Sequence, residues 1–342
     1  MKRRTTLQDI ALDLNLTPAT VSRALNNHPE ISEKTKKIVE ETAVRLNYNR
    51  NKIASSLRSG KTYVIGVLIP TAERAFFGSV IHGITNLANE NGYDVIIYQS
   101  NEKHDYEIKG INAFISARVD GILASLSKDT IDCSHFLNAK EHDIPVVLFD
   151  RVNNDLDISS VTVNDFKGAY LATEHLIKQG FKRIAHIAGP QHIKAFNDRL
   201  KGYMRALQAH HIKFDPLLVY AGDISLEEGK AGVDYLLNLP APPDAIFAVE
   251  DFAALGALKE LKQRGLQIPE AFGIIGFCND LFGEHTSPAL SSIDQQTVIM
   301  GQEAFKLIHH IIQQDDAANF PATKVELEPI PFFRKSSSRA VV

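Results

Sequence analysis

The sequence predicts a small all-α head followed by a larger α/β core of two lobes, each built on a doubly wound parallel sheet. Three observations lead to this fold class. Two short helical patterns follow one another between Leu7 and Leu25. Positive charge is concentrated in the first 62 residues. From Tyr63 onwards, buried strands and amphipathic helices alternate, and this alternation runs through twice.

The segment from residue 7 to 25 predicts two helices separated by a tight break. Asn15 suits the end of the first helix, because asparagine tolerates the left-handed conformation found at helix ends. Thr17 can cap the second helix, and Pro18 fits its first position, where a missing N–H costs nothing. The first helix carries one apolar stripe with spacings of three and four residues: Leu7, Ile10, Ala11 and Leu14.

The second helix has an apolar inner face and a polar outer face. Val21, Ala24 and Leu25 supply the inner face, while Thr20, Ser22 and Arg23 point elsewhere. Short polar side chains and one arginine are what a helix lying in the DNA major groove needs. The same pattern also fits a helical hairpin that does not bind DNA, and this stretch alone leaves both readings open.

The charge distribution favours the DNA-binding reading. Residues 1–62 contain 12 Lys+Arg and 6 Asp+Glu, a net charge of +6. The remaining chain contains 25 basic and 35 acidic residues, a net charge of −10. A basic head on an acidic body predicts that the head alone binds phosphates.

Length and composition set the broad class. A chain of 342 residues predicts two or three domains. We find no run of about 18 apolar residues and no signal-peptide core, so we expect neither a membrane span nor export. Cys133 and Cys278 lie far apart, which argues against structural zinc and for a reducing compartment, the cytoplasm.

The head extends to residue 50, and residues 51–62 form a hinge helix and linker. Ser32 can cap a third helix over residues 35–46. Residues 51–58 read as a short helix, which forms only when it docks, because eight residues cannot hold a helix alone in water. Leu57 would be exposed in this hinge.

The core, residues 63–342, predicts two similar sets of strands and helices. We expect the first lobe at about 63–162 and 294–323, and the second at about 163–293 and 324–340. The first set has strands at 64–69, 94–98, 121–125 and 145–149, and helices at 77–90, 105–117 and up to 142. The second has strands at 161–163, 183–187, 217–220, 245–249 and 273–277, and helices at 168–179, 198–211, 227–239 and 253–264. The last part has a strand at 292–294, a helix at 298–313 and a strand at 325–327 that complete the sheets.

Ligands of open parallel sheets bind beyond the carboxyl ends of the strands. Two lobes can direct these ends into one cleft that closes like a hinge. The residues there, including the segment 71–77, suit a small polar ligand such as a sugar or nucleoside, although each position also fits a loop or cap residue. Asp165, Asp198 and Asp223 fit caps or turns better. The candidate ligand contacts are Phe77, Ser125, Asp150, Arg199, Glu250, Cys278 and Asn279.

No constellation of catalytic residues is apparent. The adjacent pairs His210-His211 and His309-His310 lie on predicted helices, where their side chains diverge by about 100° and cannot share a metal. The common hydrolase and nucleotide-binding motifs are missing. We therefore predict no enzyme activity, no catalytic residues, no metal and no cofactor.

Several segments resemble the lactose-repressor (LacI-type) family of bacterial transcription regulators. The resemblance runs nearly from end to end, in order and at the family's spacing. In the head and hinge it is carried by TLQDIA (6–11), TPATVSRALN (17–26), LNY (46–48) and IASSL (53–57). In the core it is carried by IGVLIP (65–70), DGIL (120–123), PVVLFDR (145–151), HLIKQGFKRIAHIAGP (175–190) and DRLKGY (198–203).

The resemblance implies a homodimer whose two heads read a pseudo-palindromic operator. Thr6 and Ser32 match positions that contact phosphates, and Leu57 matches a residue that wedges into the minor groove. Arg58 follows it and could reach groove or phosphate. The implied DNA contacts are Thr6, Thr17, Pro18, Ala19, Thr20, Ser22, Arg23, Asn26, Ser32, Leu57 and Arg58.

The resemblance also implies a periplasmic-binding-protein-like core whose ligand controls DNA affinity. Asp150, Arg199 and Glu250 match effector-contact positions of the family. Cys278, Asn279 and Glu250 depart from common family residues and leave the ligand open, and Arg50 replaces a frequent proline. We expect a repressor that responds to a sugar or sugar derivative; a purine- or nucleoside-responsive regulator and a transport-type sugar-binding protein are the alternatives. Without a heptad tail, no tetramer built on one is expected.

Overall fold

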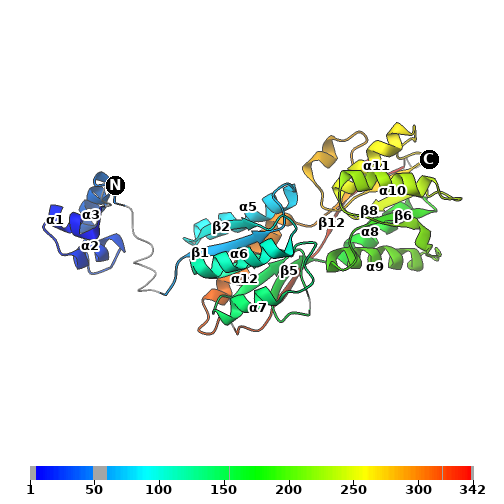
Figure 1. The fold of residues 1–342 in the computed structure, drawn as a ribbon. Coiled ribbons are helices and arrows are strands. Elements are labelled where there is room, and N and C mark those ends of the chain that lie inside the picture. The colour runs from blue at the N-terminus through cyan, green and yellow to red at the C-terminus, as the bar shows by residue number, and fades with distance from the viewer. Residues whose placement is uncertain (1–4, 49–59, 154, 318, 340–342) are drawn as a thin grey trace. The chain divides into compact units, whose positions relative to one another are not determined.

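The computed structural model describes residues 5–48, 60–153, 155–317 and 319–339. The chain divides into two compact units, Met1–Thr62 and Tyr63–Val342, which are the head and the core (Figure 1). The predicted hinge helix over residues 51–58, with Leu57 and Arg58, lies outside the described residues. No helix in the described ranges has the length and apolar character needed to cross a membrane.

The head consists of three helices whose starting points are fixed by caps. The side chains of Thr6, Thr17 and Ser32 each accept a hydrogen bond from the backbone N–H three residues further on. Asn15 has a φ of 53°, the left-handed conformation expected at the break. The helices are α1 (Leu7–Asp13), α2 (Pro18–Leu25) and α3 (Glu33–Arg45). Their shared core contains Ile10, Ala11, Val21, Ala24, Val39 and Ala43.

The first lobe of the core is a six-stranded parallel sheet in the order β11-β5-β4-β3-β1-β2. Its strands are β1 (Val64–Ile69), β2 (Asp94–Gln99), β3 (Gly121–Ala124), β4 (Val146–Phe149), β5 (Ser159–Val163) and β11 (Lys324–Leu327). Its helices are α5 (Ala75–Glu90), α6 (His104–Ala117), α7 (Ser134–Glu141) and α12 (Thr297–Ile312).

Helices cover both faces of this sheet, because alternate residues of each strand are apolar on opposite sides. Ile65 and Val67 of β1 belong to the buried cluster that includes α5 and α12. Leu68 belongs to a second cluster with Phe114 of α6 and Phe136 of α7. The inner strands β1, β3, β4 and β5 are therefore buried on both sides, as the strand-helix alternation predicts, whereas Ile96 and Ile97 of the edge strand β2 are exposed.

The second lobe is a four-stranded parallel sheet in the order β7-β6-β8-β9. Its strands are β6 (Ile184–Ala188), β7 (Val219–Ala221), β8 (Ala245–Ala248) and β9 (Gly273–Ile275). Its helices are α8 (Asp165–Lys178), α9 (Lys194–Ala209), α10 (Leu226–Leu237) and α11 (Asp251–Gln263), with short 3-10 turns η1 (Pro216–Leu218) and η2 (Leu281–His285). The segments that follow β7, β8 and β9, together with α9, contribute to the space between the lobes.

The chain passes between the two lobes three times. It passes from β5 to α8, from the antiparallel strand β10 (Ser292–Asp294) to α12, and from β11 to β12 (Ile330–Phe332), which pairs with β10. Three parallel connections of this kind allow the lobes to move as bodies about a common hinge.

Two strands lie elsewhere than the sequence predicts. Residues 161–163, expected to start the second set, belong to β5 of the first sheet. Residues 324–327, assigned above to the second lobe, form β11 and also join the first sheet. The reason is that β5 leaves an open edge beyond β4, and β11 pairs with that edge in parallel from Lys324 opposite Ser160 to Leu327 opposite Val163. A strand pattern predicts pairing but not the sheet that provides the partner.

The contact between α5 and α12 gives a stability prediction. A Cβ atom on Gly83 would lie 2.1 Å from the carbonyl oxygen of Val298, so Gly83→Ala must push the two helices apart. We expect it to lower the free energy of unfolding by about 1–3 kcal/mol. Gly78→Ala in the same helix meets nothing within 4 Å and should raise it by up to about 1 kcal/mol. Urea unfolding of the full chain measures both, and equal midpoints for the two variants would contradict this packing.

Candidate functional site

The outer face of α2 is polar and accessible. Val21 and Ala24 are buried, whereas Pro18, Ala19 and Arg23 are exposed. Among the other predicted DNA contacts, Thr6, Thr17, Asn26 and Ser32 are exposed, and Thr20 and Ser22 are half-buried. The helix therefore offers its polar side outward, as the sequence pattern predicts.

Hydrogen bonds on this face leave Arg23 loosely held. The hydroxyl groups of Thr17 and Thr20 lie 2.9 Å apart, and the Asn26 amide donates to the Ser22 carbonyl. Arg23 Nη1 lies 3.5 Å from a carboxylate oxygen of Glu30, and both side chains are more than half exposed. An exposed ion pair of this length contributes little, so a stronger acceptor can replace Glu30.

The positive charge of the head lies mainly outside its helices. Residues 5–48 contain 5 Lys+Arg and 6 Asp+Glu, whereas residues 1–4 and 49–62 contain 7 Lys+Arg and no acidic residue. The described part of the head is therefore close to neutral, and the excess of positive charge lies in the flanking segments.

A small cavity, the central cavity, lies between the two lobes. Five of the seven predicted ligand contacts line it: Phe77, Asp150, Arg199, Glu250 and Cys278. Its other lining residues are Arg74, Phe76, Arg151, Ala195, Phe196, Ile224 and Gln295. The space among these side chains is about 30 Å³, whereas ligand pockets usually measure about 300–1,000 Å³.

The two carboxylates of the central cavity hold protons more tightly than usual. Burial raises the pKa of Asp150 to about 6, against the opposing effect of Arg151 and Arg199. Burial also raises the pKa of Glu250 to about 7, although Arg74 lies beside it. Near neutral pH, Glu250 can therefore both accept and donate hydrogen bonds, whereas Asp150 becomes a donor only at slightly lower pH.

Arg199 is anchored more firmly than a ligand contact requires. It is 2% exposed and lies on α9, its Nε 2.8 Å from Asp165 Oδ1 and its Nη1 2.7 Å from the carbonyl oxygen of Val249. Its guanidinium also lies 3.8 Å from the centre of the Phe277 ring. An alanine here would leave the carboxylate of Asp165 buried without its partner, so it would destabilise the fold.

Two assignments of aspartates from the sequence are wrong. Asp165 was expected as a cap, but Asn164 caps α8, and Asp165 pairs with Arg199. Asp198 was also expected as a cap or turn residue, but it lies within α9 and pairs with Lys194. Asp223 does lie in a loop, as expected, and its carboxylate also pairs with Lys128 of the first lobe at 2.6 Å. Partners separated by 34 or 95 residues leave no trace in sequence spacing.

Ser125 and Asn279 do not line the central cavity. Ser125 lies beyond β3, and its buried hydroxyl has no hydrogen-bond partner in the described parts of the chain. Asn279 forms hydrogen bonds with Ser292, Asp294 and Arg334. These hydrogen bonds hold the loop after β9 in place. Their roles toward a ligand remain predictions.

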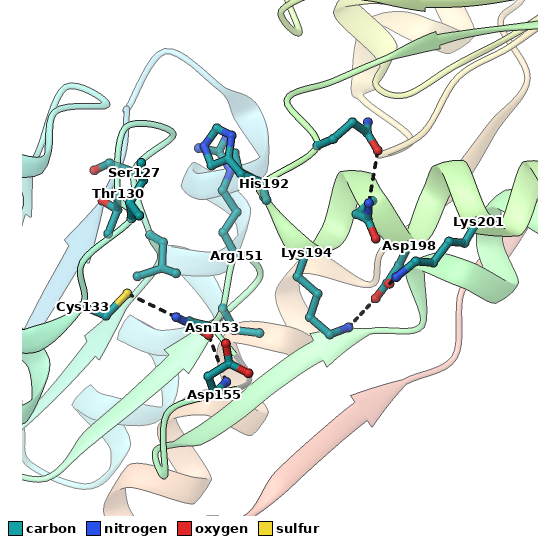
Figure 2. Close-up of a pocket in the computed structure, with 16 residues that line it drawn as sticks. Ser127, Thr130, Cys133, Arg151, Asn153, Asp155, His192, Lys194, Asp198 and Lys201 are labelled. Carbon is teal, nitrogen blue, oxygen red and sulfur yellow. Dashed lines mark hydrogen bonds and ion pairs between the residues drawn. The ribbon is translucent and has the colours of Figure 1, made fainter. Parts of the chain in front are cut away.

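A second opening, the lateral pocket, lies beside the central cavity and shares Arg151 with it (Figure 2). Its volume is about 480 Å³. Ser127, Thr130 and Asn153 approach it from the first lobe, and Lys194 and Lys201 bracket Asp198 on α9 opposite them (Figure 2). Within the described residues, no group of three or more His, Cys, Asp or Glu could hold a metal ion.

Sequence reasoning missed Arg74 as an individual residue. It lies within the segment 71–77 that was expected to border the cleft, and its side chain crosses to Glu250 of the second lobe. The position of Arg74 shortly after a strand was the only signal in the sequence. This position could not show that Glu250, across the cleft, is its partner.

A helix-turn-helix head and a two-lobed core with a central cavity define the class of ligand-binding bacterial transcription regulators. The profile described as "Bacterial regulatory proteins, lacI family" matches residues 6–51. The profile described as "Periplasmic binding proteins and sugar binding domain of LacI family" matches residues 62–335. The chain belongs to the LacI family.

Similar proteins cover most of the chain. The transcriptional repressor CytR of Escherichia coli (strain K12) is 33% identical over 303 residues, 89% of this chain and 88% of CytR. A complex of the transcriptional regulator CelR with cellobiose is 27% identical, covers 97% of this chain and 100% of CelR, and has a TM-score of 0.74. A structure of the lac repressor dimer bound to operator and the anti-inducer ONPF has a TM-score of 0.87 at 23% identity. The match covers 98% of this chain and 100% of the lac repressor chain, and it shows that the two share a fold.

The raised pKa of Glu250 predicts a pH-dependent stability. Between pH 4.5 and about 7 the folded protein keeps a proton that the unfolded chain releases. The associated stability is complete below pH 4.5 and is lost as the pH rises through 7, about 3 kcal/mol in all. Glu250→Gln should remove this part of the slope in urea unfolding, and the exposed Glu227→Gln should leave it in place. A full wild-type slope in the Glu250→Gln variant would contradict the burial of this carboxyl group.

Proposed function

We propose that this protein is a repressor that binds a pseudo-palindromic operator as a homodimer, and that a small polyhydroxylated ligand, a sugar or sugar derivative, controls its DNA affinity. The observation that carries the proposal is the combination, in one chain, of an outward polar face on α2 and a hydrogen-bonding cavity between hinged lobes. Because the proposed partner is chromosomal DNA, we propose the cytoplasm as its compartment.

The chemistry of the head supports DNA binding. Arg23 can form two hydrogen bonds to one guanine edge, and the hydroxyl groups beside it can reach bases or phosphates. Helices of the head start at Thr6, Thr17 and Ser32, and the positive end of a helix dipole at such a start suits phosphate contacts. We propose that the basic flanks, with Leu57 and Arg58, complete the contact to the operator.

The chemistry of the central cavity supports a polar ligand with many hydroxyl groups. Asp150, Glu250 and Arg199 offer charged acceptors and donors, and Phe77 and Phe196 offer flat apolar surfaces. Sugars present both hydroxyl groups and C–H faces, so this combination fits them. The aromatic rings also fit a purine or nucleoside, which is the alternative effector. A transport-type sugar-binding protein does not need a DNA-binding head, so the presence of the head argues against this alternative.

Two experiments test the proposal. DNA fragments of the source genome are retained on the full-length protein and sequenced, and we expect enrichment of an inverted repeat. Sugars, sugar phosphates, nucleosides and nucleobases are then screened by thermal shift on the full chain. Indifference to all DNA at low salt would overturn the proposal, whereas a thermal shift with nucleosides alone would favour the alternative effector.

The exposed arginine of α2 gives the prediction for the head. Arg23→Ala should weaken operator binding by about 1–3 kcal/mol and relax the preference for one base pair, because it removes a base contact. Gel-shift titration against the enriched operator and its single-base variants measures both effects. Arg45→Ala, at the end of α3, is the matched control and should bind with wild-type preference. Unchanged affinity for the Arg23 variant would exclude this side chain from the readout.

The cavity carboxylate of Asp150 gives the prediction for the core. Asp150→Asn keeps the shape and suits its φ of 59°, but it loses charge-assisted hydrogen bonds to the ligand. We expect about 10- to 100-fold weaker calorimetric affinity for the ligand found in the screen. The exposed Asp157→Asn on the same lobe should bind normally. A wild-type affinity for both variants would move the ligand away from Asp150.

A further inference from the structure

We propose that Arg74 is a latch by which the first lobe holds the second lobe closed over the central cavity, and that a ligand must release this latch to enter. Arg74 precedes α5 of the first lobe. Its Nη1 lies 3.2 Å and 3.5 Å from the carboxylate oxygens of Glu250, and its Nη2 lies 2.9 Å from the carbonyl oxygen of Ile224. Both partners belong to the second lobe.

An aromatic ring is the third partner of the guanidinium, and we call the three partners, Glu250, Ile224 and Phe252, the seat of Arg74. The carbon centre of the Arg74 guanidinium lies 4.3 Å from the centre of the Phe252 ring, in the first turn of α11. A carboxylate, a carbonyl oxygen and a ring face are three favourable partners for one cation. The seat therefore holds the side chain of Arg74 from three sides, and all three belong to the lobe opposite its own.

The low exposure of this contact distinguishes it from a surface ion pair. The Arg74 side chain is 20% exposed and the Glu250 side chain 9% exposed, so water screens the pair weakly. Most other cations near the cavity pair within their own lobe: Arg151 with Glu102, and Arg199 with Asp165. Separating the lobes breaks the Arg74 contact and leaves these two pairs intact.

A second, more exposed connection lies further along the cleft. Lys128 Nζ lies 2.6 Å from Asp223 Oδ2, with 25% and 44% of the two side chains exposed. His192 Nε2 lies 2.5 Å from the carbonyl oxygen of Lys128. Since these groups are more accessible to water, we assign them a weaker share in closure than Arg74.

The size of the central cavity connects the latch to ligand entry. A space of about 30 Å³ among the lining side chains, one of which is Arg74, is far smaller than a sugar-sized pocket. If the ligand binds there, a step that rests on the proposed function, the lobes must part and Arg74 must leave its seat. The free energy needed to break the Arg74 contact then weakens the apparent binding free energy of the ligand by the same amount.

The test measures the distance between the lobes in the full chain without DNA or ligand. Spin labels are attached to Ile131→Cys on the first lobe and Leu217→Cys on the second, both exposed positions, in a Cys133→Ser, Cys278→Ser background. Labelled chains are diluted with unlabelled chains so that only distances within one chain are recorded. Arg74→Gln should raise the ratio of long to short distances about tenfold.

Two further variants make the outcome decisive. Arg74→Lys keeps the charge but cannot reach all three partners, so it should give a smaller increase, and it carries the test if the glutamine variant fails to fold. Lys103→Gln removes a cation that pairs with Asp129 of its own lobe and should leave the distances unchanged. Wild-type distances in both Arg74 variants would overturn the latch. The proposed function would fail separately, in the DNA selection.

Discussion

The guanidinium of Arg199 is the group on which the arrangement of the cleft depends. A buried charge is tolerated only with partners, and Arg199 has the Asp165 carboxylate, the Val249 carbonyl oxygen and the Phe277 ring around it. These partners come from α8, the end of β8 and the end of β9, so one side chain fixes three elements of the second lobe against α9. These contacts tie together the wall that the second lobe presents to the central cavity, because loss of Asp165 would leave the buried charge of Arg199 uncompensated.

The contrast between this rigid wall and the contacts across the cleft explains how the core can move. Arg199–Asp165 and Arg151–Glu102 lie within single lobes and survive a change in the angle between them. Arg74–Glu250 and Lys128–Asp223 join different lobes and do not survive it. Because the three chain connections between the lobes are short, the lobes can rotate as bodies while each keeps its own buried pairs. Charge pairing thus separates the parts that stay fixed from the parts that move.

The sequence could predict elements and faces but not long-range partners. The caps Thr17 and Ser32, the inner face of α2 and five residues of the central cavity follow from local patterns and from position after a strand, whereas the cap Thr6 was not predicted. The sheet that receives residues 324–327 does not, because a strand pattern is the same at either edge. The partners of Arg199 and Arg74 likewise depend on packing between segments 34 and 176 residues apart, which no spacing rule records.

The distribution of charge in the head divides the work of DNA recognition between two parts of the sequence. Residues 5–48 hold 5 basic and 6 acidic residues, so their net charge alone does not attract a duplex. In the proposed mode of DNA binding, the 7 basic residues of segments 1–4 and 49–62 supply the attraction that does not depend on base sequence. In the same proposal, α2, with Arg23 as its one charged residue, discriminates between sequences where its few polar groups meet matching base edges. Affinity from the flanks and discrimination from α2 can therefore change independently of one another, and the hinge segment that carries much of the positive charge is also the connection to the ligand-controlled core.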